Sequence, residues 1–233
     1  MKKFFAILLM VCILIPSTNI YSADKNTKAN ESDSFPGINV GSRLQFGNYP
    51  FETDGTEKPI EWIVLAKDGG KTLLLSRYLL DRVPYNDKSE NVSWENCFIR
   101  KWLNEEFISK AFNDEENGRI QISNVQNNPN PDYSTPGGNA TSDKVFLLSI
   151  EECEKYFKNN KDRVAFPTPY AVKKGAASEE DFGGADWQWL RSPGKNPKMA
   201  AIVQLDGKIH SHGFIVEQDQ AAARPAIWVE ISN

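Results

Sequence analysis

Five side chains in the last third of the sequence have the chemistry to bind a ligand: Trp187, Arg191, His210, His212 and Arg224. Trp187 offers a flat ring that can stack on a sugar or a peptide, and each arginine offers a planar fork of donors for an anion. The two histidines stand two residues apart, so a strand places both imidazoles on one face. We take these five residues as the candidate ligand-binding set.

The aromatic members of this set also have a structural interpretation. Trp187 and Trp189 share one face of a predicted strand. We expect Trp189 in the core, because Leu190 follows it in the strand. For Trp187 two interpretations remain, a core residue and an aromatic platform. We expect His210 and His212 to be exposed hairpin residues, because no neighbouring carboxylate completes a metal or acid–base site.

Arg191 and Arg224 are expected to be structural as well. A partly buried arginine with several partners ties loops onto a sheet, either by donating to carbonyl groups or by pairing with a carboxylate. We consider Asp186 and Asp206 as the carboxylates for such a pair.

The sequence carries no recognisable catalytic constellation. A Gly-x-Ser-x-Gly elbow is absent, and no spacing links Ser192 or Ser211 to a histidine in a triad. The carboxylates are too many and too scattered to select a glycosidase pair. Two cysteines and two histidines at unrelated spacings predict no zinc site. We therefore expect no catalytic residue, no metal and no cofactor.

Alternating apolar and polar residues predict the strands that position these side chains. Alternation on both sides of Asp206-Gly207 predicts two antiparallel strands joined by a tight turn, since glycine adopts the positive φ that hairpin turns require. A second hairpin is predicted with its turn at residues 67–71. The other predicted strands cover residues 43–46, 60–65, 72–76, 145–148 and 225–231.

Helix-start signals occupy the middle of the chain. Ser149 with Glu152 forms a capping box that opens a helix over 150–157. Thr168 before Pro169 is an N-cap with a first-turn proline, which predicts a short helix that ends at Gly175. Further N-caps are predicted at Ser93 for a helix over 94–103, at Asn104 for a helix through 112, and at Asn113.

Residues 1–23 have the features of a secretory signal peptide, with Lys2 and Lys3, an apolar run over 4–15 and a polar tail. The apolar run is shorter than the roughly 20 residues of a membrane-crossing helix. We expect cleavage after Ala23, no stable transmembrane anchor, and a protein that is secreted, periplasmic or at the cell surface.

The rest of the chain divides into a leader and one domain. Residues 24–37 are rich in Asn, Ser, Lys and Asp without apolar periodicity, which predicts a flexible leader. Residues 38–233 suit a single globular domain. In this domain Cys97 and Cys153 either pair, as export permits, or stay buried thiols beside large apolar residues.

The charge of the chain argues against nucleic acid as a partner. It has 27 Lys and Arg against 31 Asp and Glu, a formal net charge of −4. No basic stripe contradicts this balance.

Five motifs follow one another at 59–62, 100–104, 144–149, 189–194 and 224–228: Pro-Ile-Glu-Trp, Arg-Lys-Trp-Leu-Asn, Lys-Val-Phe-Leu-Leu-Ser, Trp-Leu-Arg-Ser-Pro-Gly and Arg-Pro-Ala-Ile-Trp. Their order and spacing resemble the bacterial domain of unknown function family numbered 6273. More distantly, the closing pattern resembles the C-type-lectin-like fold of the formylglycine-generating-enzyme type. That resemblance implies an α+β domain of mainly antiparallel sheets, with several short helices between N-terminal and C-terminal strands that pair.

This sequence lacks the residues that carry two known functions of that fold group. No cysteine follows Cys153, so the oxidase chemistry of formylglycine-generating enzymes is not expected. The Glu-Pro-Asn or Gln-Pro-Asp loop of calcium-dependent lectins is also missing, and Asn130-Pro131-Asp132 comes too early to replace it.

We expect an exported, non-enzymatic recognition domain whose ligand is a glycan, a peptide or a surface protein. Its binding loops are predicted at 127–140, which is rich in Pro, Gly and Asn, at 183–187 and at 195–198. The alternatives are a hydrolase-like cell-envelope enzyme that uses His210, His212 and a loop carboxylate, and a structural module of an envelope assembly.

Overall fold

The computed structural model describes residues 38–230 of the chain. The predicted signal peptide (1–23) and the predicted leader (24–37) lie outside these residues. Within the described part, no helix combines the length and the apolar character needed to cross a membrane.

Short strands and short helices make up this part of the chain. The strands are β1 (Arg43–Pro50), β2 (Glu57–Asp68), β3 (Lys71–Ser76), β4 (Asp81–Arg82), β5 (Ser123–Val125), β6 (Thr141–Asp143), β7 (Val145–Phe146), β8 (Gln188–Pro193), β9 (Met199–Val203), β10 (Ile209–Ile215), β11 (Ala222–Ala223) and β12 (Ala226–Glu230). The helices are η1 (Trp94–Asn96), α1 (Phe98–Trp102), η2 (Leu103–Phe107), α2 (Ile108–Ala111), α3 (Asp114–Arg119), α4 (Ile150–Tyr156), α5 (Asn160–Arg163), α6 (Pro169–Lys173) and η3 (Glu180–Phe182).

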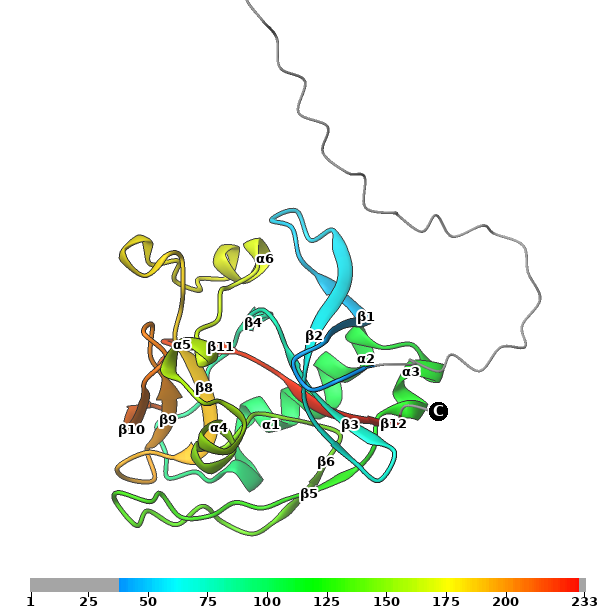
Figure 1. Ribbon diagram of the computed structural model, residues 1–233. Helices are drawn as coiled ribbons and strands as arrows, with labels where there is room; N and C mark the ends of the chain where they lie inside the picture. The colour runs from blue at the N-terminus through cyan, green and yellow to red at the C-terminus, as the bar shows by residue number, and fades with distance from the viewer. Residues whose placement is uncertain (1–37, 231–233) are drawn as a thin grey trace, which may run out of the picture. The chain divides into compact units, whose positions relative to one another are not determined.

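Two five-stranded sheets form the framework (Figure 1). The first sheet has the order β1-β2-β3-β12-β7 and the second the order β10-β9-β8-β11-β4, while β5 and β6 form a separate pair. Every pair of named strands is antiparallel except β8 with β11. The predicted α+β class, with mainly antiparallel sheets and short helices between N-terminal and C-terminal strands, is confirmed.

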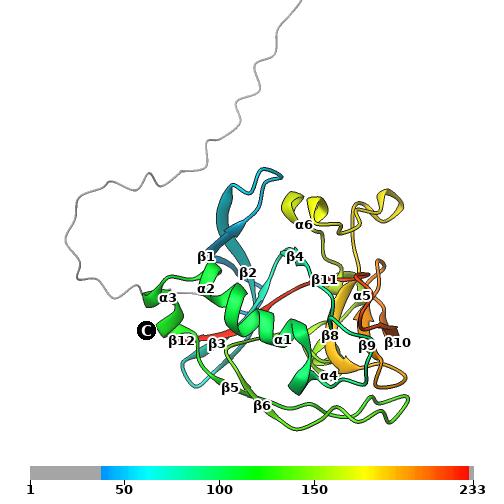
Figure 2. The same ribbon diagram turned by 180° about the vertical axis from the view of Figure 1, so that it is seen from behind.

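The first sheet joins the two ends of the domain. The C-terminal strand β12 pairs with β3 on one side and with β7 on the other. The helical segment from α1 to α2 lies along one face of this sheet (Figure 2). An aromatic cluster holds it there, with ring centroids of Phe46 and Phe112 5.3 Å apart and those of Tyr49 and Phe107 5.1 Å apart.

One predicted helix boundary is wrong. The helix runs without a break from α1 through the π-helical turn η2 to the end of α2, and Asn104 lies inside it. The Asn104 side chain accepts hydrogen bonds from the backbone N–H groups of Lys144 and Val145 and donates one to Val145 O at 2.8 Å. The asparagine therefore binds the strand β7 rather than the start of a helix.

The other N-cap predictions have mixed outcomes. The capping boxes at Asn113 and Ser149 are present, and the Thr168 side chain accepts from Ala171 N. Ser93 precedes only the short turn η1 and makes no side-chain cap, and α1 starts after Cys97.

The predicted hairpin at Asp206-Gly207 joins β9 to β10, and Gly207 has a φ of +80°. A Cβ atom on Gly207 would overlap the carbonyl oxygen of Asn160 on α5. The side chain of Arg163, also on α5, donates from Nε to Gly207 O at 2.8 Å. The turn is therefore clamped against α5 as well as being set by its own glycine.

The structure distinguishes between the two interpretations of the cysteines. Cys97 and Cys153 are both buried and free. Burial raises the pKa of each thiol to about 12, so both stay protonated at neutral pH. They are buried apolar residues of the core, as one of the two interpretations predicted.

Candidate functional site

Arg224 lies inside the domain, at 4% exposure. Its Nε donates to Ser76 O and its Nη1 to Arg163 O, both at 2.9 Å, and Nη1 also reaches Gln188 Oε1 at 3.3 Å. Burial without a neutralising carboxylate lowers the pKa of this guanidinium to about 10. Arg224 therefore satisfies carbonyl groups, as the structural interpretation requires, and pairs with neither of the expected aspartates.

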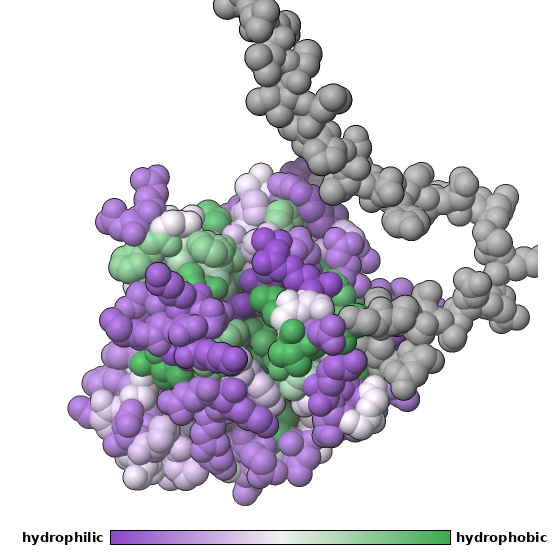
Figure 3. Space-filling model, in the orientation of Figure 1, coloured by the Kyte–Doolittle hydropathy of each residue, from purple (hydrophilic) through white to green (hydrophobic). Residues whose placement is uncertain are grey.

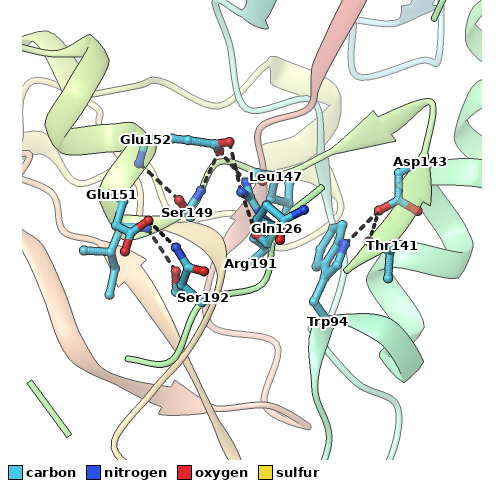
Figure 4. Close-up of polar contacts among 12 residues, drawn as sticks. Trp94, Gln126, Thr141, Asp143, Leu147, Ser149, Glu151, Glu152, Arg191 and Ser192 are labelled. Atoms are coloured by element: carbon cyan, nitrogen blue, oxygen red, sulfur yellow. Dashed lines mark hydrogen bonds and ion pairs between the residues drawn. The ribbon is translucent and has the colours of Figure 1, made fainter. Parts of the chain in front are cut away.

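Arg191 is buried in a second polar network (Figure 4). Its two terminal nitrogens contact the two carboxylate oxygens of Glu152, one of them at 2.9 Å, and they also donate to Leu147 O and Gln126 O. Glu152 in turn accepts from Ser149 N in the capping box of α4. The partner is therefore Glu152 rather than an aspartate, and Arg191 ties β8 to α4.

The other three candidates come together at the edge strand β10 of the second sheet. Trp187, His210 and His212 join Phe214 and Tyr133 in a continuous series, which we call the aromatic row. Successive ring centroids are 6.0 Å apart for Trp187 and Phe214, 6.0 Å for Phe214 and His210, 5.7 Å for His210 and His212, and 5.9 Å for His212 and Tyr133. Tyr133 is 41% exposed, and the other four rings are half-buried.

A bulge in the edge strand β10 shapes the middle of the aromatic row. Alternation places His210, His212 and Phe214 on one face, and a straight strand would spread their rings along its length. The register with β9 shifts between His210, which pairs with Ile202, and Phe214, which pairs with Ala200. Gly213 lies in this bulge with a φ of +76°, and a Cβ atom there would overlap Ala200 O. The local geometry therefore requires glycine.

The two imidazoles stack in parallel, with 10° between their planes. Burial, and then the neighbouring His212, lower the pKa of His210, so this ring is neutral at pH 7. His210 Nδ1 is buried and has no hydrogen-bond partner within residues 38–230. Neither histidine is hydrogen-bonded to a carboxylate in this part of the chain, and no group of three potential metal ligands occurs there.

Two of the three predicted binding loops lie beside the aromatic row. In the loop at 127–140, the buried Asn130 donates from Nδ2 to Pro193 O at 2.7 Å and to Ser211 O at 2.8 Å. Lys195 N donates to His212 O at 2.9 Å, which attaches the loop at 195–198 to β10. Both loops are thus bonded to the strand that carries the histidines.

The third predicted loop, at 183–187, contributes Trp187 to a pocket at this end of the aromatic row. We call this the end pocket. Its volume is about 200 Å³, and it is lined by Phe182, Trp187, Gln204, Leu205 and Asp206. Figure 3 shows one face of the molecule, on which most side chains are hydrophilic. Apolar side chains gather in separate areas of this face, one of them over α6. The end pocket combines both kinds of side chain.

Asp186 holds the backbone next to Trp187 in place. Its carboxylate accepts from Trp187 N at 2.7 Å and from Ala177 N at 2.8 Å, and it lies 3.3 Å from Arg82 Nη1. Burial nevertheless dominates and raises the pKa of Asp186 to about 6. This buried carboxylate fixes the loop from which Trp187 projects.

The raised pKa of Asp186 predicts a pH dependence of stability. The folded protein binds this proton more tightly than the unfolded chain, so the contribution is fully present below the ordinary pKa near 3.8 and is lost as the pH rises through about 6. Relative to Asp186→Asn, the wild type should gain about 1 kcal/mol between pH 7 and pH 5. Urea unfolding of both proteins at the two pH values measures this; a constant difference contradicts it.

The fold and the aromatic row define this protein as an α+β domain with a row of aromatic side chains along the edge strand β10 of its second sheet. Residues 69–231 match the family described as a domain of unknown function (DUF6273), and the chain belongs to this family. The match starts within the turn before β3, so the motif at 59–62 lies outside it. A comparison with curated proteins found no match, and neither did a comparison with solved structures.

Sequence reasoning missed Phe214, Tyr133 and Phe182. The signal for Phe214 was present, because it follows His212 at the same two-residue spacing that groups the histidines. The glycine between them marks a bulge. Tyr133 is a single aromatic residue in a loop otherwise rich in Pro, Gly and Asn, and nothing in the sequence ties it to His212.

Proposed function

We propose that this domain is a recognition module that binds an extended ligand along the aromatic row. The observation that carries this proposal is the unbroken contact of five partly exposed rings, contributed by three separate segments of the chain. Aromatic side chains offer large contact areas with little loss of side-chain freedom, and contiguous exposed apolar surfaces mark interaction sites. The ligand is a glycan, a peptide or a surface protein.

The rigidity of the support favours binding. All six residues of β8 are buried, and β9 pairs with both β8 and β10. Side-chain hydrogen bonds from Asn130 and a backbone bond from Lys195 hold the adjoining loops. A surface that is already ordered loses less freedom on binding than a flexible one.

We infer that the domain has the C-type-lectin-like arrangement. Two features support this inference: the C-terminal strand β12 pairs with β3 near the N-terminal end of the domain, and irregular loops extend from the second sheet. With residues 1–23 as a signal peptide, the module acts outside the cytoplasm. This analogy concerns the fold and assigns no ligand.

The proposal is tested by truncating the aromatic row. The full-length protein is applied to a glycan array and to a displayed peptide library, and each hit is measured again with Tyr133→Ala, His212→Ala and Phe214→Ala. Central aromatic residues of an interface contribute about 2 kcal/mol or more, so at least one variant should weaken binding by roughly thirtyfold.

The matched control is Phe51→Ala, which removes an aromatic ring from a different cavity, lined also by Tyr49 and Tyr78. This variant should bind as the wild type does. Hits that bind equally well to all three row variants, or the absence of any hit, would overturn the proposal. Thermal unfolding of each variant confirms that a loss of binding is not a loss of folding.

A further inference from the structure

We propose that the end pocket binds one pyranose ring, which makes the ligand of the aromatic row a glycan. This inference rests on the proposed recognition function and narrows it to one substrate class. It is carried by the side chains that line the end pocket, their hydrogen-bonding state and the elements that hold them.

The apolar part of the end pocket suits the face of a sugar ring. Phe182 at the end of η3 and Trp187 in the loop that follows it supply two aromatic rings, and Phe182 is 47% exposed. Aromatic faces carry partial negative charge and attract the polarised C–H groups on one side of a pyranose. The volume of about 200 Å³ is of the size of a single ring.

The polar part of the end pocket suits hydroxyl groups. The Gln204 side-chain amide and the Trp187 indole N–H form no hydrogen bond with any residue from 38 to 230. A planar amide presents a donor and an acceptor side by side, which matches neighbouring sugar hydroxyls. These two groups are therefore available to a ligand that carries both donors and acceptors.

Asp206 supplies a fixed acceptor. One carboxylate oxygen accepts from Lys208 N at 3.0 Å and the other pairs with Lys208 Nζ at 2.7 Å. These hydrogen bonds lower the pKa of Asp206, so it stays ionised at neutral pH. An ionised acceptor with lone pairs to spare favours hydroxyl donors and disfavours anions.

Hydrogen bonds and a close backbone contact fix both sides of the end pocket. Arg163 and the close contact at Gly207 fix the turn that carries Gln204 and Asp206. Asp186 fixes the backbone of Trp187 on the other wall. Weak ligands such as single sugars need this kind of preorganisation, because they have few contacts to offset the loss of freedom on binding.

The test is a titration followed by nuclear magnetic resonance. The full-length protein is titrated with the methyl pyranosides of glucose, galactose, mannose and N-acetylglucosamine, and separately with cyclohexanemethanol, which has a similar ring but lacks the ring hydroxyls. The indole N–H signal of Trp187 is assigned from its absence in Trp187→Phe. We expect saturable shifts of this signal with at least one glycoside, at millimolar concentration, and none with cyclohexanemethanol.

Variants separate the end pocket from the rest of the aromatic row. Gln204→Ala should weaken glycoside binding about three- to tenfold, as expected for one lost hydrogen bond. Phe51→Ala, in the separate cavity lined also by Tyr49 and Tyr78, should leave monosaccharide binding unchanged. Tyr133→Ala, at the far end of the row, should weaken the binding of longer oligosaccharides. Gln204 is a half-buried hairpin residue, and a thermal melt verifies that its variant is folded.

The outcomes for the two proposals are distinguishable. Equal shifts with cyclohexanemethanol, or no saturable shift with any of the four glycosides, overturn the pyranose site. If the array and library experiment then yields a peptide whose binding needs the aromatic row, the recognition function stands and only the glycan assignment fails. If neither experiment yields a ligand, both proposals fail.

Discussion

Replacing Arg224 by alanine is expected to lower the melting temperature by roughly 4–20 °C, because a domain of this size loses about 2–4 °C per kcal/mol. Truncating a large buried side chain costs about 2–5 kcal/mol through the cavity alone. The change also removes the donors that reach Ser76 O on β3 and Arg163 O on α5. Arg224 therefore joins two parts of the fold, and scanning calorimetry measures its contribution.

Arg224→Met is the matched variant. Methionine fills much of the same volume and removes a charge with which no carboxylate in residues 38–230 pairs. Because a buried charge without a counter-ion is itself costly, this variant should melt closer to the wild type than Arg224→Ala. An alanine variant that melts like the wild type and fails to bind ligand would show that Arg224 acts in recognition instead.

Replacing Arg191 by alanine is expected to reduce the free energy of unfolding by about 3–5 kcal/mol, the usual effect of breaking a buried ion pair from one side. Glu152 would keep its charge without its guanidinium partner, and Leu147 O and Gln126 O would lose their donors. Urea unfolding of the variant measures the loss.

An exposed ion pair provides the comparison. Lys101 and Glu105 lie 4.0 Å apart on the helix surface, and Lys101→Ala should cost no more than about 0.5 kcal/mol. A cycle that combines Arg191→Ala with Glu152→Gln then isolates the coupling between these two residues. If Arg191→Ala and Lys101→Ala reduce the free energy of unfolding by the same amount, burial does not make the Arg191 ion pair more stabilising than an exposed one.

Features with a local physical cause could be predicted from the sequence. Gly207 has a positive φ because the turn between β9 and β10 demands it, and Ser149 with Glu152 closes a capping box over four residues. Such local reasoning gave the wrong prediction for Asn104. Its side chain has the same capacity to cap a helix, but distant backbone groups at residues 144 and 145 bind it instead.

In the candidate site, too, local features could be predicted from the sequence and those set by tertiary contacts could not. The two-residue spacing of His210 and His212 is enough to predict that both rings share one face, and the rings do stack there. Their contacts with Phe214 and Tyr133 depend on a bulge and on a loop docked by Asn130, which are set by tertiary contacts. The sequence indicated Trp187 as a possible platform, but the end pocket forms only where the β9–β10 turn meets the loop before β8.

The position of β12 has a consequence for how the chain acquires its structure. β12 follows all the other strands of the first sheet in the sequence, yet it lies between β3 and β7 and pairs residues 226–230 with residues 71–75. Until residues 226–230 are synthesised, β3 and β7 both have open edges and the first sheet is in two pieces. Contacts so distant in sequence form slowly. Folding of the first sheet must therefore wait until β12 has been synthesised, and a chain truncated before Ala226 should expose strand edges that promote aggregation.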